Sequence, residues 1–109
     1  MAIHKIEPDN WQQKLNQMSA VLENKITNIE VAGLDIGDQT EAESITLRGF
    51  AYDPKSDIVE IIFDELDHNI SSPTAIYYSE ERGLIDAIEI VDVDKKVQII
   101  SFVEPLLLS

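Results

Sequence analysis

The sequence predicts an α+β fold, in which one N-terminal helix packs on a mostly antiparallel, strongly coiled sheet of five to six strands or on a small open barrel. Three observations predict it. One segment near the start of the chain has the spacing of an amphipathic helix, and short β-branched segments joined by turn residues follow it. No second helical pattern follows the first strand, so neighbouring strands should be antiparallel.

The helix is predicted over residues 7–23, EPDNWQQKLNQMSAVLE. Pro8 suits the first helical position, and Asp9 lies favourably near the positive end of the helix dipole. The apolar residues share one face at helical spacing, and they are Trp11, Leu15, Met18 and Leu22. Such a face can line a ligand pocket, but packing on a sheet is its far more common use.

Six strand-like segments follow, and they cover residues 26–32, 44–52, 58–63, 69–78, 84–91 and 97–103. The segment IVEIIF, residues 58–63, is nearly all apolar and is therefore placed centrally in the sheet. Gly49 predicts a bulge or a sharp bend within its strand. Pro73 lacks an N–H donor, which places its strand at an edge or interrupts it. The final PLLLS, residues 105–109, should dock on the body of the protein or on another subunit, because exposed leucines are unfavourable.

The composition is that of one globular domain over residues 1–109, long enough to bury a core. The chain has no cysteine, which excludes disulfides, thiolate zinc sites, iron–sulfur clusters and a cysteine nucleophile. The first residues lack the features of a signal peptide, and no apolar run approaches the length of a membrane helix. We therefore expect a cytoplasmic protein.

The charge is strongly acidic, with 8 basic and 21 acidic residues and a formal net charge of −13. Such a chain repels phosphate groups, so neither nucleic acid nor an anionic membrane is expected as a partner. A basic protein or a cation is electrostatically allowed. A high net charge also keeps a small domain soluble without any partner, and this is the more common reason for it.

The segment FDELDHNI, residues 63–70, gathers three carboxylates around His68. Transition metals prefer imidazole or thiolate ligands, and the calcium-binding spacing of an EF-hand is absent, so no metal or cofactor is expected. His4 could supply a second imidazole ligand only if the fold brings the N-terminus close to His68. The alternative is a polar loop with His68 at the surface or at an edge. Asp67 and His68 are retained as candidate binding residues.

The segment GLDIGDQTEAE, residues 33–43, is the second candidate. Its glycines permit unusual dihedral angles and its acids supply oxygens, which would suit a loop that binds a basic peptide. The candidate residues are Asp35, Gly37, Gln39 and Glu41. The alternative is a wide turn whose glycines are geometric and whose aspartates bond to the backbone.

Arg48 is the third candidate, because alternation places it on one strand face with Phe50 and Tyr52. An arginine beside aromatic rings can hold an anionic ligand. The alternative is an ion pair with Glu43 or Glu60 above a half-buried ring. The sequence offers no convergent set of catalytic residues.

The order of several motifs resembles a family of small bacterial proteins catalogued as a domain of unknown function. The family pattern is a tryptophan helix, a V-x-V-x-G-x-D-I-G-x-Q-x-E-A segment, L-x-G, H-x-I-x-x-P-T and an E-I strand. Seventeen positions match it: Trp11, Val31, Gly33, Asp35, Ile36, Gly37, Gln39, Glu41, Ala42, Leu47, Gly49, His68, Ile70, Pro73, Thr74, Glu89 and Ile90. Ile29 and Asn69 depart from it. The resemblance implies a bacterial domain and brings no activity, cofactor or catalytic residue with it.

The sequence therefore predicts a non-enzymatic protein that binds another protein or a second copy of itself. The alternative is a sensor of a small molecule or a cation, built at the mouth of the coiled sheet with Asp35, Asp67 and His68. A concave pocket with convergent polar groups would favour the sensor, and an interior filled by side chains would count against it.

Overall fold

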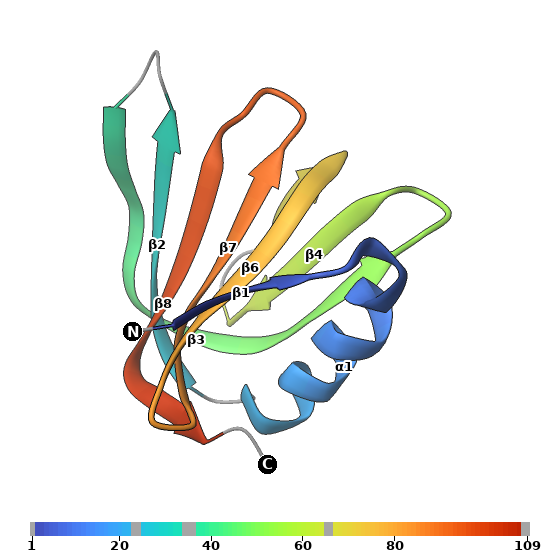
Figure 1. Cartoon of the computed structure of the whole chain (residues 1–109). Helices are drawn as coiled ribbons and strands as arrows, with labels where there is room; N and C mark the ends of the chain where they lie inside the picture. Colours follow the sequence, from blue (N-terminus) through green and yellow to red (C-terminus); the bar gives the residue numbers. More distant parts are fainter. Residues whose placement is uncertain (1, 23–24, 34–36, 65–66, 108–109) are drawn as a thin grey trace.

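The computed structural model describes residues 2–22, 25–33, 37–64 and 67–107, with side chains for all of these except 21–22, 37–44 and 103–107. One short 3-10 turn, one helix and eight strands make up the described part of the chain (Figure 1). Their bounds are β1 Ala2–Ile6, η1 Pro8–Asn10, α1 Trp11–Leu22, β2 Lys25–Gly33, β3 Gly37–Asp53, β4 Ile58–Phe63, β5 Asp67–Ser71, β6 Pro73–Glu81, β7 Leu84–Asp92 and β8 Val97–Leu107.

All eight strands form one antiparallel sheet in the order β1-β6-β7-β8-β2-β3-β4-β5. The predicted fold class is confirmed, but the sheet has two strands more than the six expected. One is β1, which was not predicted. The other arises because Pro73, as predicted, interrupts its strand, and Ser72 before it has a positive φ of 52°. The sheet is open, with β1 at one edge and β5 at the other.

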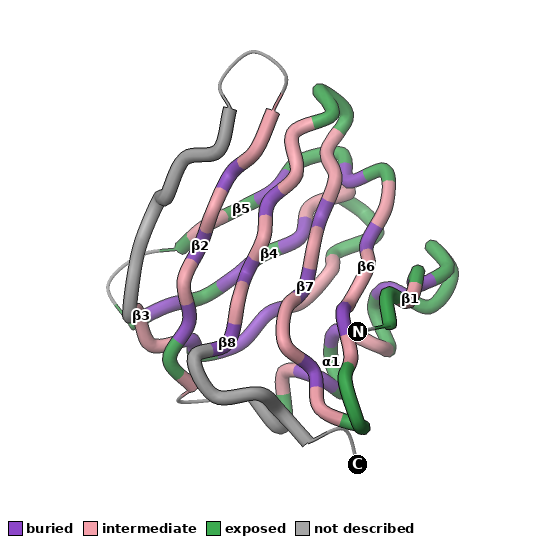
Figure 2. Tube along the Cα trace, turned by 60° about the vertical axis from the view of Figure 1, so that its left-hand side comes forward, coloured by how far each residue is buried: buried purple, intermediate pink, exposed green. Residues whose placement is uncertain are grey.

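The sheet curls strongly enough for distant strands to touch. β5 and β8 are separated by three strands in the sheet order, yet the ring of His68 contacts the side chain of Gln98. Buried and less buried residues alternate along strands such as β2 and β4 (Figure 2), as expected for a sheet with one face turned to the core. Ile29, Ile61, Ile70 and their neighbours fill the interior as one apolar cluster.

Helix α1 packs on β3 and completes this core. Trp11, Leu15 and Met18 are buried on the predicted apolar face. The helix approaches β3 very closely at Gly49, where an added Cβ atom would lie 2.7 Å from Oγ of Ser19. That hydroxyl accepts a hydrogen bond of 3.2 Å from the backbone N–H of Phe50. A side chain at position 49 would push the Ser19 hydroxyl away and break this hydrogen bond at the point where helix and strand meet.

The register of β3 and β4 shifts between Leu47 and Gly49, which confirms the predicted bulge. The shift changes the alternation of the strand, so that Leu47 and Phe50 both point into the core. Arg48 is exposed. The prediction that Arg48 shares a face with Phe50 and Tyr52 is therefore wrong, because strict alternation does not survive a bulge.

Two further expectations for the loops change. β3 begins at Gly37, so residues 37–43 lie on a strand that pairs with β2, and only residues 34–36 connect the two strands. At the other end of the chain, Leu106 and Leu107 pair with Ile85 and Leu84, so this part of the tail docks on the protein's own β7. In the described part of the chain, no helix is long and apolar enough to cross a membrane.

Candidate functional site

The predicted binding residues of segment 33–43 do not form one loop. Asp35 lies outside the described residues. Gly37 and Gln39 are opposite Gly33 and Val31 in the β2–β3 pairing. Glu41 lies where this pairing is irregular, between Thr40 and Ala42. Residues 37–43 therefore lie in the long strand β3 and not in a loop.

Arg48 pairs with Asp64, the last residue before the β4–β5 connection, and both side chains are 43% exposed. The predicted alternative of an ion pair is thus right in kind: among the described side chains the partner is Asp64, and the side chain of Glu43 lies outside the described residues. The pair lies on the surface, where such contacts contribute little to stability. It ties the end of β4 to the bulge in β3.

Asp67 and His68 begin β5, the edge strand at one side of the sheet. Asp67 is exposed, whereas His68 is half-buried and points inward. Nε2 of His68 contacts Oε1 of Gln98, which is itself buried at 8% exposure. A buried amide requires a hydrogen-bond partner, so this contact fixes β5 against β8. Gln98 was not recognised from the sequence, because an isolated glutamine in an apolar strand carries no pattern.

The far end of β5 is fixed as well. The N–H of Ser72 donates to the carbonyl of Asp57 (2.8 Å), and the hydroxyl of Tyr52 donates to Oδ1 of Asp57 (2.6 Å). That hydrogen bond, together with burial and the negative charges of Asp57 and Asp53, raises the pKa of Tyr52 to about 12. The pKa of Asp53 is lowered, because its carboxylate accepts hydrogen bonds from the Lys55 N–H and the Ser56 hydroxyl.

The sensor alternative required a hollow interior. The inward side chains of the described strands and of α1 form a continuous apolar cluster instead. Within the described residues, no three histidine or carboxylate side chains lie close enough together to hold a metal ion. The described residues therefore give no support for the predicted pocket with Asp35, Asp67 and His68.

The opposite edge strand, β1, has a different character. Ile3 is 62% exposed on its outer side, and Lys5 beside it is also exposed. The strand, AIHKI, contains no acidic residue, although the chain has 21 of them. Within the described part of the chain, β1 pairs with β6 alone. Two isoleucines shortly before Pro8 were the sequence signal for this strand.

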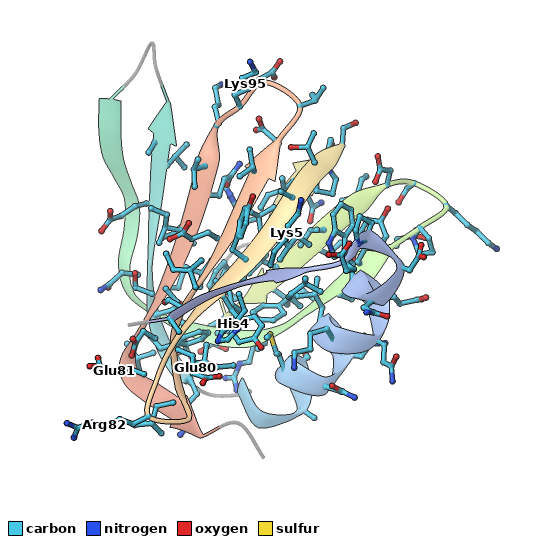
Figure 3. The ribbon with its side chains drawn as sticks, in the orientation of Figure 1. His4, Lys5, Glu80, Glu81, Arg82 and Lys95 are labelled. Carbon is cyan, nitrogen blue, oxygen red and sulfur yellow. The ribbon has the colours of Figure 1, made fainter. Side chains whose placement is uncertain are left out.

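The inner side of β1 holds a cluster of polar side chains from β1, β6 and α1, of which Figure 3 labels His4 and Glu80. The ring of His4 stacks on Tyr78 with 4.9 Å between ring centres, and Nζ of Lys14 lies 5.3 Å from the centre of the same ring. Nε2 of His4 is shielded from solvent, has no hydrogen-bond partner among the described residues, and lies 3.8 Å from Oε2 of Glu80. The cluster anchors β1 to β6 and leaves the outer side of the strand uncovered.

The direction of the backbone groups in β6 follows from the β7–β8 turn. The N–H of Asp92 donates to the carbonyl of Lys96 (3.0 Å), so the backbone groups of Asp92 point toward β8. Consecutive residues of an antiparallel strand point these groups to alternate sides. Those of Glu89 therefore point toward β6, where Glu89 is opposite Tyr77. Tyr77 in turn directs its own backbone groups toward β7.

The same alternation identifies the free groups of β1. Because Tyr77 bonds toward β7, Tyr78 directs its N–H and C=O toward β1, where it is opposite His4. His4 thus bonds to β6. Ile3 and Lys5 direct their N–H and C=O groups away from the sheet, to the open edge. Each of these two residues offers one donor and one acceptor to an added strand.

This arrangement has the chemistry of a strand-binding edge. An extended peptide can add to such an edge, with main-chain hydrogen bonds for affinity and side-chain contacts for specificity. Ile3 supplies an exposed apolar contact, and β1 adds no carboxylate of its own to the repulsion from the rest of the chain. We name Ala2–Ile6, with its outward groups at Ile3 and Lys5, the open edge.

The fold and the edge define a small acidic α+β protein with one helix on an open, coiled antiparallel sheet. A family of unknown function, DUF5335, matches residues 2–109, and the chain belongs to that family. It is also similar to an uncharacterized protein of Aquifex aeolicus (strain VF5), with 42% identity over 93 residues that cover 84% of each chain. No solved structure matches the chain. The resemblance found in the sequence is confirmed.

Proposed function

We propose that this protein is a non-enzymatic protein-interaction module that binds an extended protein segment along the open edge. The observation that carries the proposal is the outward direction of the backbone groups of Ile3 and Lys5, next to an isoleucine that is 62% exposed. Natural edge strands usually avoid such exposure by means of charge, proline or a covering element. Here Lys5 is the only such feature on β1 itself.

The distribution of charge supports the same surface. Residues 1–22 contain Lys5, Lys14, Glu7 and Asp9, two basic and two acidic residues, which balance. The other residues contain the remaining 6 basic and 19 acidic residues, which sum to −13. A neutral or acidic segment can therefore approach the open edge with less repulsion than at other parts of the chain.

The experiment uses short random peptides selected for binding to the immobilised protein. Selected peptides are then measured against Ile3→Pro and Ile3→Val. Proline removes the outward N–H of residue 3 and places its ring on the open edge, but it removes no hydrogen bond to β6. Valine keeps both the N–H and a β-branched side chain, and it is the matched control.

We expect Ile3→Pro to weaken binding at least about tenfold, which corresponds to the loss of one or two backbone hydrogen bonds. Ile3→Val should bind within about twofold of the wild type. Peptides that bind Ile3→Pro as well as the wild type would contradict the proposal. Amide chemical shifts of the labelled protein provide a second test, because changes confined to surfaces away from β1 would also contradict it.

A further inference from the structure

The open edge requires an occupant whose own backbone groups match those of Ile3 and Lys5. We infer that this occupant is β1 of a second copy of the chain, paired antiparallel about a two-fold axis at His4. The inference rests on the proposed function and names its partner. Two copies joined in this way would form one continuous sheet across the axis, the closed symmetric arrangement most common in homodimers.

Charge favours this pairing over other contacts between two copies. Each chain carries −13, so two copies repel one another at most orientations. Residues 1–22 are neutral in sum, because Lys5 and Lys14 balance Glu7 and Asp9. Pairing through β1 therefore joins two segments that are neutral in sum, and Glu80 of the adjoining strand β6, opposite Ala2, lies close to His4.

The register follows from the outward groups. With the axis at His4, Ile3 of each copy lies opposite Lys5 of the other, and these two residues exchange both of their backbone hydrogen bonds. All outward groups of Ile3 and Lys5 are then satisfied on both copies. An axis at Lys5 would place two ammonium groups opposite each other, which is unfavourable. An axis at Ile3 would leave Lys5 opposite position 1, which lies outside the described residues.

The side-chain contacts across the two β1 strands are also favourable in this register. The exposed Ile3 would pack against the aliphatic stem of Lys5 of the second copy, on the outer face of the joined sheets. The two His4 residues would face each other across the axis as a non-hydrogen-bonded pair, because their backbone groups already bond to β6. In such a pair the Cα atoms lie about 4.5 Å apart, a distance that a disulfide can span.

The chain has no cysteine, so His4→Cys introduces a single thiol at the axis. The matched control is Asn69→Cys, an exposed residue in the middle of β5, the other edge strand. Under the same mild oxidation, we expect His4→Cys to form a covalent dimer at least about tenfold faster than Asn69→Cys, because pairing raises the effective concentration of the thiols. Equal rates for the two variants would overturn the inference.

Sedimentation of the wild type, Ile3→Pro and Ile3→Val provides a measurement that does not depend on the new thiol. The wild type and Ile3→Val should dimerise, more strongly as salt screens the repulsion between the copies, and Ile3→Pro should dimerise at least about tenfold more weakly. A wild type that stays monomeric, or an Ile3→Pro dimer as strong as that of the wild type, would overturn the inference. If peptide binding still depended on residue 3 in either case, the proposed function would stand and only its partner would be wrong.

Discussion

The two edge strands of the sheet, β1 and β5, have five residues each, and each carries one of the two histidines on its inner face. Their inner contacts differ. His68 of β5 bonds to the buried Gln98, and Ile70 is 1% exposed. His4 of β1 stacks on the half-buried Tyr78, and its Nε2 has no hydrogen-bond partner among the described residues.

The outer sides differ as well. Asp67, Asn69 and Ser71 make the outer side of β5 polar, and all three are exposed. The outer side of β1 presents Ile3 and Lys5. A sheet that curls back on itself fixes one edge against its own interior, whereas the other edge stays at the surface. Under the proposed function, β5 is a structural edge and β1 is the edge that binds a partner strand.

The largest expected difference between the edges concerns their isoleucines. Ile70→Ala removes a buried side chain and should lower the free energy of unfolding by about 2–5 kcal/mol. Ile3→Ala removes a mostly exposed side chain and should change it by about 0.5 kcal/mol or less. Urea denaturation of both variants measures the two values. Similar losses for the two would mean that β1 is as firmly packed as β5.

Substituting the two histidines should also destabilise the protein more at β5 than at β1, but the difference should be smaller than for the isoleucines. His68→Ala leaves the buried amide of Gln98 without its partner and should destabilise the protein by about 1–3 kcal/mol. His4→Ala loses a partly exposed ring stack, for which we expect about 0.5–1 kcal/mol. The double variant His68→Leu/Gln98→Leu replaces both polar partners and should recover part of the loss. A double variant less stable than His68→Ala would show that the lost polar contact does not explain the destabilisation of His68→Ala.

Alkaline pH should loosen the end of β5 near Ser72. The folded pKa of Tyr52, about 12, lies above the ordinary value of 10.0, so its contribution is fully present below pH 10 and is lost as pH rises toward 12. Absorbance near the tyrosinate band should show one of the three tyrosines titrating late. In Tyr52→Phe that late step should be absent. A late step that persists would assign the shift to another tyrosine.

The sequence carried enough information for the fold class because periodicity reports which faces are buried. The helix, predicted over residues 7–23 and observed as α1 at Trp11–Leu22, and the interruption at Pro73 both followed from local rules. The bulge at Gly49 was also predicted, but its consequence was not. A bulge reverses the alternation beyond it, so Arg48 was placed on the wrong face until the register of β3 and β4 was known.

The candidate site was less predictable, because both edges depend on contacts between residues far apart in the sequence. Nothing local to His68 indicates that Gln98, 30 residues away, will meet it. Nothing local to Ile3 indicates that its strand will lie at an edge. That position depends on β6 pairing with β7 on its other side, which is a property of the whole sheet. The acidic segments were chosen as candidates because of their composition, whereas the open edge differs from the rest of the chain because β1 contains no acidic residue.

The smallest expected effect tests whether β1 depends on the β6–β7 hairpin that carries it. Arg82 and Gly83 form its two-residue turn, both with positive φ (55° and 80°). Asparagine adopts this conformation more readily than arginine, so Arg82→Asn should stabilise the protein by about 0.5–1 kcal/mol. Arg82→Gln removes the same charge without this preference, and it should not stabilise the protein to that extent.

Amide hydrogen exchange then separates the two edges. If β1 opens together with the hairpin, Arg82→Asn should slow exchange at His4 and Tyr78, which pair between β1 and β6, more than at Ile70 in β5. Equal slowing at all three amides would mean that both edges open only in global unfolding. In that case the difference between them would be one of surface chemistry and not of local stability, and the open edge would be a rigid template that binds a strand without first having to order.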